Sequence, residues 1–118
     1  MPAGLPDTVG ATHFQEVAFV FDNIEGLGYA SNPFQGKPQS YVDLANLMSS
    51  SWIRFIHDLD PNSGSNGREP LWPKYNGQEP RNIVWEATTV GLVVVEKDDF
   101  RSTGIKLISD NLATVYKI

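Results

Sequence analysis

The sequence predicts a mixed α/β fold with one long amphipathic helix, short helices and two or three strands. The long helix is predicted because apolar residues between positions 41 and 59 recur every three or four residues. Strands are predicted at residues 82–87 and 91–98, two short runs rich in valine and isoleucine that lie between turn-forming residues. With 118 residues, the length fits one domain that can bury a sizeable core without disulfides or metal.

The first third of the chain has no strong periodicity. Residues 1–12 contain two prolines and two glycines and are interpreted as an irregular lead-in. Residues 15–23 become apolar, but their pattern does not decide between a short helix and a strand. Three glycines and two prolines at residues 22–38 then predict a surface loop.

The long helix carries the clearest pattern. Ser40 is the expected N-cap, with Asp43 three residues on, and Asp60 with Pro61 is expected to end the helix. Such a helix would be about 28 Å long at 1.5 Å per residue, so its stripe needs a large surface to cover it. The stripe consists of Tyr41, Leu44, Ala45, Met48, Trp52, Phe55, Ile56 and Leu59.

The remaining segments alternate turns with short elements. Residues 62–67 are predicted as a polar turn, and residues 70–80 as a proline-bounded loop rich in aromatic side chains. After the two strands, residues 98–112 predict a closing turn and helix, with Asp98 or Asp99 at the start of the helix.

Composition excludes several classes of function. Fourteen acidic against nine basic residues give a net charge of −5, and no two basic residues are adjacent, so a nucleic-acid partner is not expected. The absence of cysteine excludes a disulfide framework, a thiol nucleophile and thiolate metal ligands from this chain. No apolar run approaches the roughly 20 residues of a spanning helix, and no segment resembles a cleavable signal. No cofactor or metal is expected.

Four motifs follow one another along the chain. They are G-x-x-H-x-x-E followed by F-V-F at residues 10–21, W-x-x-F followed by D-P-N at residues 52–62, "LWPKY" at residues 71–75 and "KDDFRSTG" at residues 97–104. In this order they resemble the C-terminal end of a type-B carboxylesterase/lipase, the cholinesterase-like branch of the α/β-hydrolases. The stretch "DDFRSTG" most resembles the corresponding stretch of fungal members.

The resemblance implies that residues 1–118 are the C-terminal part of a carboxylesterase-like α/β-hydrolase domain. His13 would be the catalytic base of a Ser-His-Asp/Glu triad, taking the serine proton and returning it to the leaving alcohol. Glu16 would brace the histidine loop by hydrogen bonding. Members of the family are often secreted, and the signal would then lie in an upstream part.

The nucleophile of that family is missing from this chain. No G-x-S-x-G stands in the sequence, nor does the glycine run of an oxyanion hole or a recognisable acid segment ahead of the histidine. These parts and most strands are expected upstream of Met1. The chain alone is therefore expected to be inactive, to take a carboxylic ester substrate only when that part completes it, and to self-associate through exposed apolar surface.

Other interpretations of the same residues stay open. His13 could be an exposed histidine without a role, or half of a metal site with Glu16, while His57 could interact with the end of the long helix. The three tryptophans suggest either a ligand platform or, more in keeping with their spacing, packing. The chain could also be a stand-alone binding or interaction module. Asp58, Asp60, Asn62 and Glu69 have the spacing of an EF-hand-like calcium loop, although its central glycine is missing.

Overall fold

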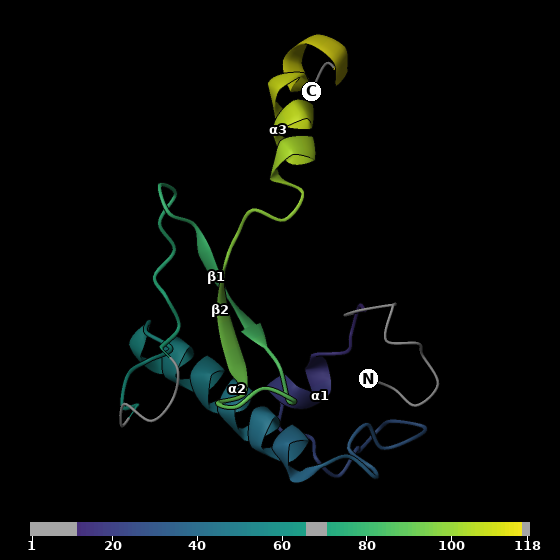
Figure 1. The fold of residues 1–118 in the computed structure, drawn as a ribbon. Coiled ribbons are helices and arrows are strands. Elements are labelled where there is room, and N and C mark those ends of the chain that lie inside the picture. The colour runs from purple at the N-terminus through teal and green to yellow at the C-terminus, as the bar shows by residue number, and fades with distance from the viewer. Residues whose placement is uncertain (1–11, 66–70, 117–118) are drawn as a thin grey trace.

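The computed structural model describes residues 12–65 and 71–116 and contains four helical segments and one two-stranded sheet within that part (Figure 1). Residues 1–11 of the predicted lead-in at residues 1–12 lie outside the described residues, as does Glu69. This mixture of helix and strand agrees with the predicted composition of elements and is consistent with a piece of an α/β fold. In chain order the elements are α1 (Val17–Val20), α2 (Gln39–Asp58), β1 (Arg81–Trp85), β2 (Val93–Lys97), α3 (Ser102–Asp110) and the π-helical segment η2 (Leu112–Tyr116).

Helix α2 is the predicted long helix, but its first residue, Gln39, lies one residue before Ser40, the expected N-cap. Pro38, with φ −56° and an extended ψ of 155°, precedes the first helical residue, so Ser40 lies inside the helix and the predicted N-cap was wrong. Proline fixes φ near the helical value, which favours a helix start directly after it. At the other end Leu59 adopts a left-handed φ of 59° and donates its N–H to the carbonyl of Phe55, and the helix stops before Pro61 as predicted.

The core lies along the first half of α2. One cluster joins Ala18 of α1 and Phe34 of the 22–38 loop to Ala45, and a second joins Leu44 and Met48 to Ala87, two residues after β1. Residues 22–38 contain no helix or strand, as the sequence predicted. The second half of the stripe stays open to solvent: the exposed fractions are 39% for Trp52, 45% for Phe55, 75% for Ile56 and 80% for Leu59.

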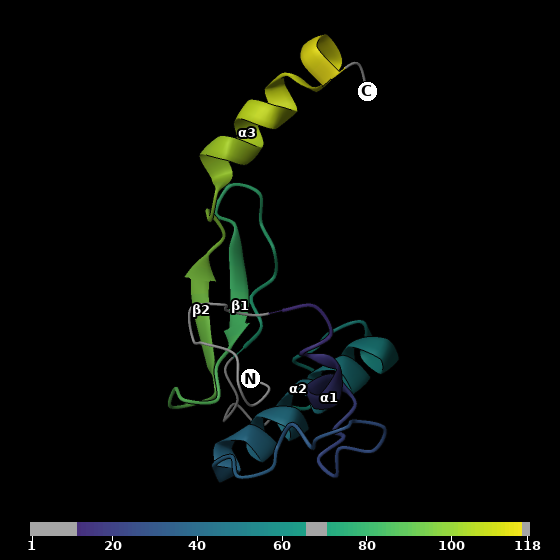
Figure 2. The same ribbon diagram turned by 90° about the vertical axis from the view of Figure 1, so that its right-hand side faces the viewer.

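The two predicted strands form an antiparallel hairpin. Arg81 pairs with Lys97 at its open end, and Trp85 pairs with Val93 next to the turn. Within that turn Leu92 has a left-handed φ of 64°, and its carbonyl accepts the N–H of Glu86. Figures 1 and 2 show the hairpin rising from α2 toward α3.

Helix α3 differs from its prediction at its first residue. The residue before it is Arg101, in a left-handed conformation with φ 58°, and no side chain caps the helix. Asp99 contributes only its backbone carbonyl, which accepts the N–H of Ser102 at 3.0 Å. The expected start at Asp98 or Asp99 was therefore wrong, because the chain makes one further turn before the helix begins.

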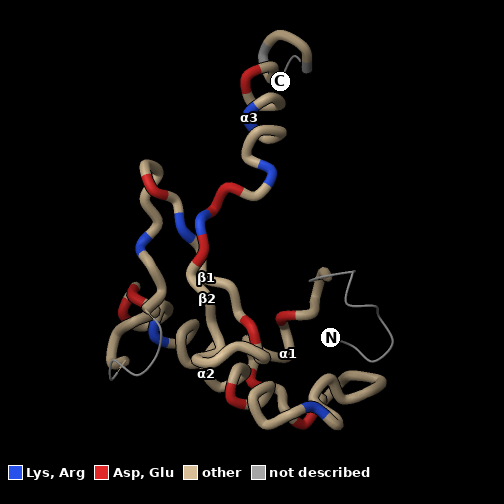
Figure 3. The backbone as a smooth tube through the Cα atoms, in the orientation of Figure 1, with Lys and Arg blue, Asp and Glu red and all other residues tan. Residues whose placement is uncertain are grey.

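The described chain is extended. Its Cα radius of gyration is 17.3 Å, against about 13.5 Å for a compact domain of this length, and both views show α3 projecting from the rest (Figures 1 and 2). Acidic and basic residues are scattered along the tube and do not separate into opposite regions (Figure 3). Within the described ranges, the helices are too short or too polar to cross a membrane.

Candidate functional site

His13 lies on a turn that leads into α1. Its side chain is exposed, and the turn covers residues 13–16 directly before Val17. The next residue, Phe14, has a left-handed φ of 73°, which a bulky side chain rarely adopts. The Phe14 ring lies nearly parallel to the imidazole, with 6.4 Å between the ring centres and 8° between the planes. The imidazole is therefore accessible from solvent.

Hydrogen bonds between Thr12 and Gln15 close this turn below His13. The backbone N–H of Thr12 donates to the side-chain oxygen of Gln15 at 2.9 Å, and its hydroxyl donates to the same oxygen at 3.5 Å. In return, the backbone N–H of Gln15 donates to the carbonyl of Thr12 at 3.3 Å. The turn therefore depends on the side chain of Gln15, which the sequence interpretation did not single out.

A sequence signal for this arrangement exists. Thr12 and Gln15 have the S/T-x-x-E/Q spacing of a capping box, in which the fourth side chain reaches back to the first backbone N–H. This hydrogen bond, from the Thr12 N–H to the Gln15 side chain, is present here. It precedes a tight turn rather than a regular helix, because α1 begins only at Val17.

Glu16 is the last residue of the turn and directly precedes α1. Its backbone carbonyl accepts the N–H groups of Phe19 and Val20, at 3.0 and 2.9 Å, which starts the helix. Its side chain is exposed and lies at the edge of a groove of about 550 Å³. Bracing of the histidine loop by Glu16 stays a prediction, because the residues that precede Thr12 lie outside the described part.

The groove beside the His13 turn separates α1 and α2 from the edge of β1. Its walls are mainly apolar, with Glu16 and Glu86 as the two carboxylates. The lining residues are Thr12, Gln15, Glu16, Phe19, Tyr41, Leu44, Met48 and residues 83–87. Among the described residues, no group of three side chains able to hold a metal ion occurs, so a metal site built on His13 and Glu16 gains no support.

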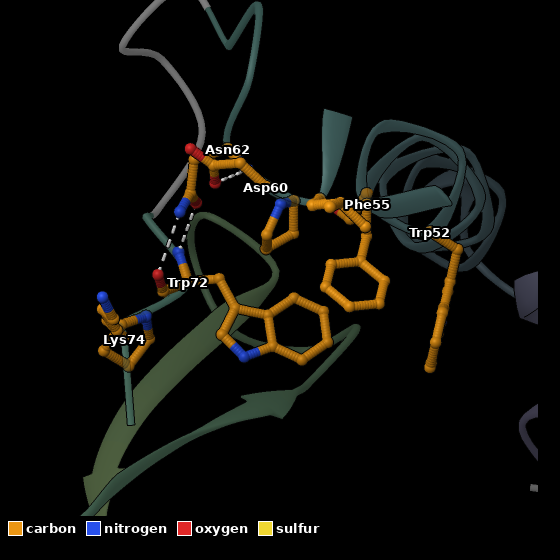
Figure 4. Close-up of a pocket in the computed structure, with 10 residues that line it drawn as sticks. Trp52, Phe55, Asp60, Asn62, Trp72 and Lys74 are labelled. Atoms are coloured by element: carbon orange, nitrogen blue, oxygen red, sulfur yellow. Dashed lines mark hydrogen bonds between the residues drawn. The ribbon is translucent and has the colours of Figure 1, made fainter. Parts of the chain in front are cut away.

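A second pocket, of about 600 Å³, lies near the end of α2 and contains two of the three tryptophans. Figure 4 shows the Trp72 ring turned toward Phe55, and Trp52 on the far side of Phe55. Trp72 makes edge-to-face contacts with Trp52 and Trp85, at 6.3 and 5.5 Å between ring centres. Such edge-to-face pairs are a common way of packing aromatic rings, which agrees with the packing interpretation of the tryptophans.

The polar groups of the proposed calcium loop face different partners. Asp58 accepts one hydrogen bond from the Ser63 hydroxyl and forms another with the His57 ring. These two bonds, that from Ser63 foremost, lower the pKa of Asp58 below its ordinary value. The Asn62 side chain instead bonds to the backbone of Trp72, accepting its N–H at 2.7 Å and donating to its carbonyl at 3.0 Å (Figure 4). The described part of this segment is therefore not arranged as a cation cage.

Comparison with known proteins relates the chain to hydrolases. No family model matches it. It is 30% identical over 92 residues to carboxylesterase 4A of Bos taurus, 32% over 84 residues to secreted lipase 1 of Botryotinia fuckeliana, and 27% over 78 residues to phenmedipham hydrolase of Pseudarthrobacter oxydans. These alignments cover 78%, 70% and 64% of this chain, but only 15%, 13% and 15% of the respective relatives.

The predicted resemblance to carboxylesterases and lipases is confirmed by these alignments. The expected fungal origin stays a prediction, since the three relatives come from a mammal, a fungus and a bacterium. The aligned region spans about one seventh of the length of each relative.

Proposed function

We propose, from the premise that this chain is a carboxylesterase-like segment, that it is the C-terminal part of a carboxylic ester hydrolase and contributes the triad histidine. The observation that carries the proposal is the exposed His13 on its closed turn, at the position where the G-x-x-H-x-x-E motif has its histidine. There the imidazole would accept the proton of an upstream serine during attack on the ester carbonyl. It would then protonate the leaving alcohol.

The surface of the chain supports its assignment as part of a larger fold. The accessible surface is 8997 Å², whereas a compact monomer of 13.1 kDa exposes roughly 6,400 Å². Large apolar side chains are among the exposed residues, because half of the α2 stripe is open to solvent and α3 has no buried residue. A larger domain that covered these faces would account for their apolar character.

Carboxylic esters are the proposed substrates, without a choice among acyl or alcohol groups. The relatives carry different names, a carboxylesterase, a lipase and a hydrolase of phenmedipham. In the proposed enzyme the residues that select among esters would lie mainly upstream.

Replacing the two histidines one at a time tests the role of His13. We would exchange the matching segment of the Botryotinia secreted lipase for this chain and measure hydrolysis of a short-chain aryl ester. In an active chimera, His13→Ala should lower kcat by at least about 1,000-fold, because members of a triad act as a unit. His57→Ala is the matched control, since His57 is the other histidine and lies exposed at the end of α2. Its kcat should stay within about twofold.

Equal rates for the chimera and its His13→Ala variant would disprove the proposed role. The 118-residue chain by itself should hydrolyse the same ester no faster than free imidazole, because it offers no G-x-S-x-G nucleophile. Turnover by that chain which disappears in His13→Ala would instead reveal a nucleophile within these residues.

A further inference from the structure

We infer that Gln15 is a positioning residue for His13, because its side-chain oxygen holds the turn that carries the imidazole. The catalytic part of this inference rests on the proposed function of His13. The inference goes beyond the motif interpretation, in which His13 and Glu16 were the residues of interest and Gln15 occupied an unspecified position.

The geometry of the turn provides the first argument. The Gln15 oxygen receives the backbone N–H of Thr12 at 2.9 Å, and the Gln15 N–H returns to the Thr12 carbonyl at 3.3 Å. His13 and Phe14 are the two residues enclosed between these contacts. Removing the oxygen would leave the N–H of a partly buried residue without this partner, which costs more than losing an exposed hydrogen bond.

Backbone strain at Phe14 provides the second argument. A φ of 73° is unfavourable for a residue with a side chain relative to the right-handed region, so surrounding contacts must hold it there. Two sets of contacts do so. The Gln15 hydrogen bonds close the base of the turn, and the Phe14 ring packs on Tyr29, with 6.3 Å between ring centres and an angle of 44°.

The direction of the His13 side chain depends on this held conformation. If Phe14 returned to a negative φ, the backbone at His13 would rotate and the imidazole would leave its position beside Phe14. Displacement of a catalytic group by about 1 Å can cost about 100-fold in rate, without a comparable effect on substrate binding. Loss of the Gln15 oxygen should therefore appear in kcat rather than in KM.

Two substitutions of Gln15 distinguish the effect of its acceptor oxygen from the effect of its side-chain length. Gln15→Met keeps the length of the side chain and removes the acceptor, whereas Gln15→Glu keeps the acceptor. Gln39→Met is the matched control, because Gln39 forms its side-chain bond with Asp43 on the exposed face of α2. In the 118-residue chain, Gln15→Met should speed hydrogen exchange at the Thr12 amide by roughly tenfold. Gln15→Glu and Gln39→Met should leave this exchange unchanged within about twofold.

The same variants are then measured in the active chimera. Gln15→Met should lower kcat about 10- to 100-fold with KM changed by less than about threefold, and Gln15→Glu should restore most of the rate. Unchanged Thr12 exchange in Gln15→Met would overturn the inference whatever the kinetics. Faster exchange with unchanged kcat would also overturn it. Full activity of the His13→Ala variant would disprove the proposed function, and the positioning role of Gln15 would fall with it. The exchange rate of the Thr12 amide would still show whether the Gln15 hydrogen bond exists.

Discussion

At the scale of single residues, Glu86 is the carboxylate whose environment makes the clearest prediction. It lies in the turn of the hairpin, where the hydroxyl of Thr88 donates to its side chain at 2.6 Å and the Thr88 N–H donates at 3.2 Å. These bonds, with that from the hydroxyl first, favour the charged carboxylate and lower the pKa of Glu86 below its ordinary value of 4.5. The turn is therefore sensitive to acid.

Replacing the hydroxyl should reverse this effect. Thr88→Val is expected to raise the pKa of Glu86 toward 4.5, as measured by the pH dependence of its side-chain carboxyl NMR signal. Since the folded pKa is lowered, the stabilisation is complete above the unfolded value and is lost as the pH falls through the folded value. Thr103→Val on α3 is the control and should leave Glu86 unchanged. An equal pKa in the parent chain and Thr88→Val would contradict the assignment of the hydroxyl.

Motif and spacing located His13, but they did not reveal how it is held. The turn around it depends on which of several short polar side chains finds a backbone partner. Thr12 and Gln15 have the spacing of a capping box, but that spacing alone does not show that their hydrogen bonds close a tight turn instead of starting a regular helix. The strained φ of Phe14 was equally hidden, because strain of this kind is imposed by tertiary contacts such as that with Tyr29.

At the scale of elements, Asn62 joins the end of α2 to the aromatic loop before β1. Its side chain bonds both the N–H and the carbonyl of Trp72, ten residues on, and so closes the intervening segment (Figure 4). Asn62→Ala should release this closure at a cost of about 1–3 kcal/mol, because two partly buried backbone groups lose their partner. Exchange of the Trp72 amide should become faster and tryptophan emission should shift to the red.

Asn62→Asp distinguishes the two hydrogen bonds of this closure. It keeps the acceptor for the Trp72 N–H and loses the donor, so it should fall between Asn62 and Ala in both measurements. Asn46→Ala serves as the control, since that side chain bonds only to the Val42 carbonyl within α2. Emission and exchange that match the parent chain in Asn62→Ala would show that the aromatic contacts alone close the segment.

The elements themselves were predictable because their signals are local. Apolar periodicity placed α2 within one or two residues of Gln39–Asp58, and β-branched runs placed β1 and β2. The two helix starts were predicted wrongly for different reasons. Pro38 is a sequence signal that the choice of Ser40 as N-cap did not use, whereas the left-handed conformation of Arg101 before α3 has no such signal. Exposure of the second half of the stripe could not be derived from periodicity, which indicates a face but not what covers it.

At the scale of the whole molecule, α2 and α3 have exposed apolar faces that no other described element covers. Helix α3 has no buried residue, although Ile105 and Ile108 lie one turn apart on it with 59% and 52% of their surfaces exposed. On α2, Ile53 and Ile56 are 62% and 75% exposed. A two-stranded hairpin also leaves both outer strand edges unpaired within the described residues. Exposed apolar faces and open edges both promote association between molecules.

The isolated 118-residue chain should therefore bind a hydrophobic dye and self-associate, with partial helix content in circular dichroism and a concentration-dependent sedimentation coefficient. Ile56→Glu should weaken both association and dye binding, because it places a charge within the exposed apolar face of α2. Asn46→Glu, on a polar position of the same helix, should change neither. If instead the parent chain sedimented as a monomer, unfolded cooperatively and bound no dye, its core would suffice for independence. The stand-alone binding module would then replace the hydrolase segment as the better account, since a fold that needs no covering domain requires no upstream partner.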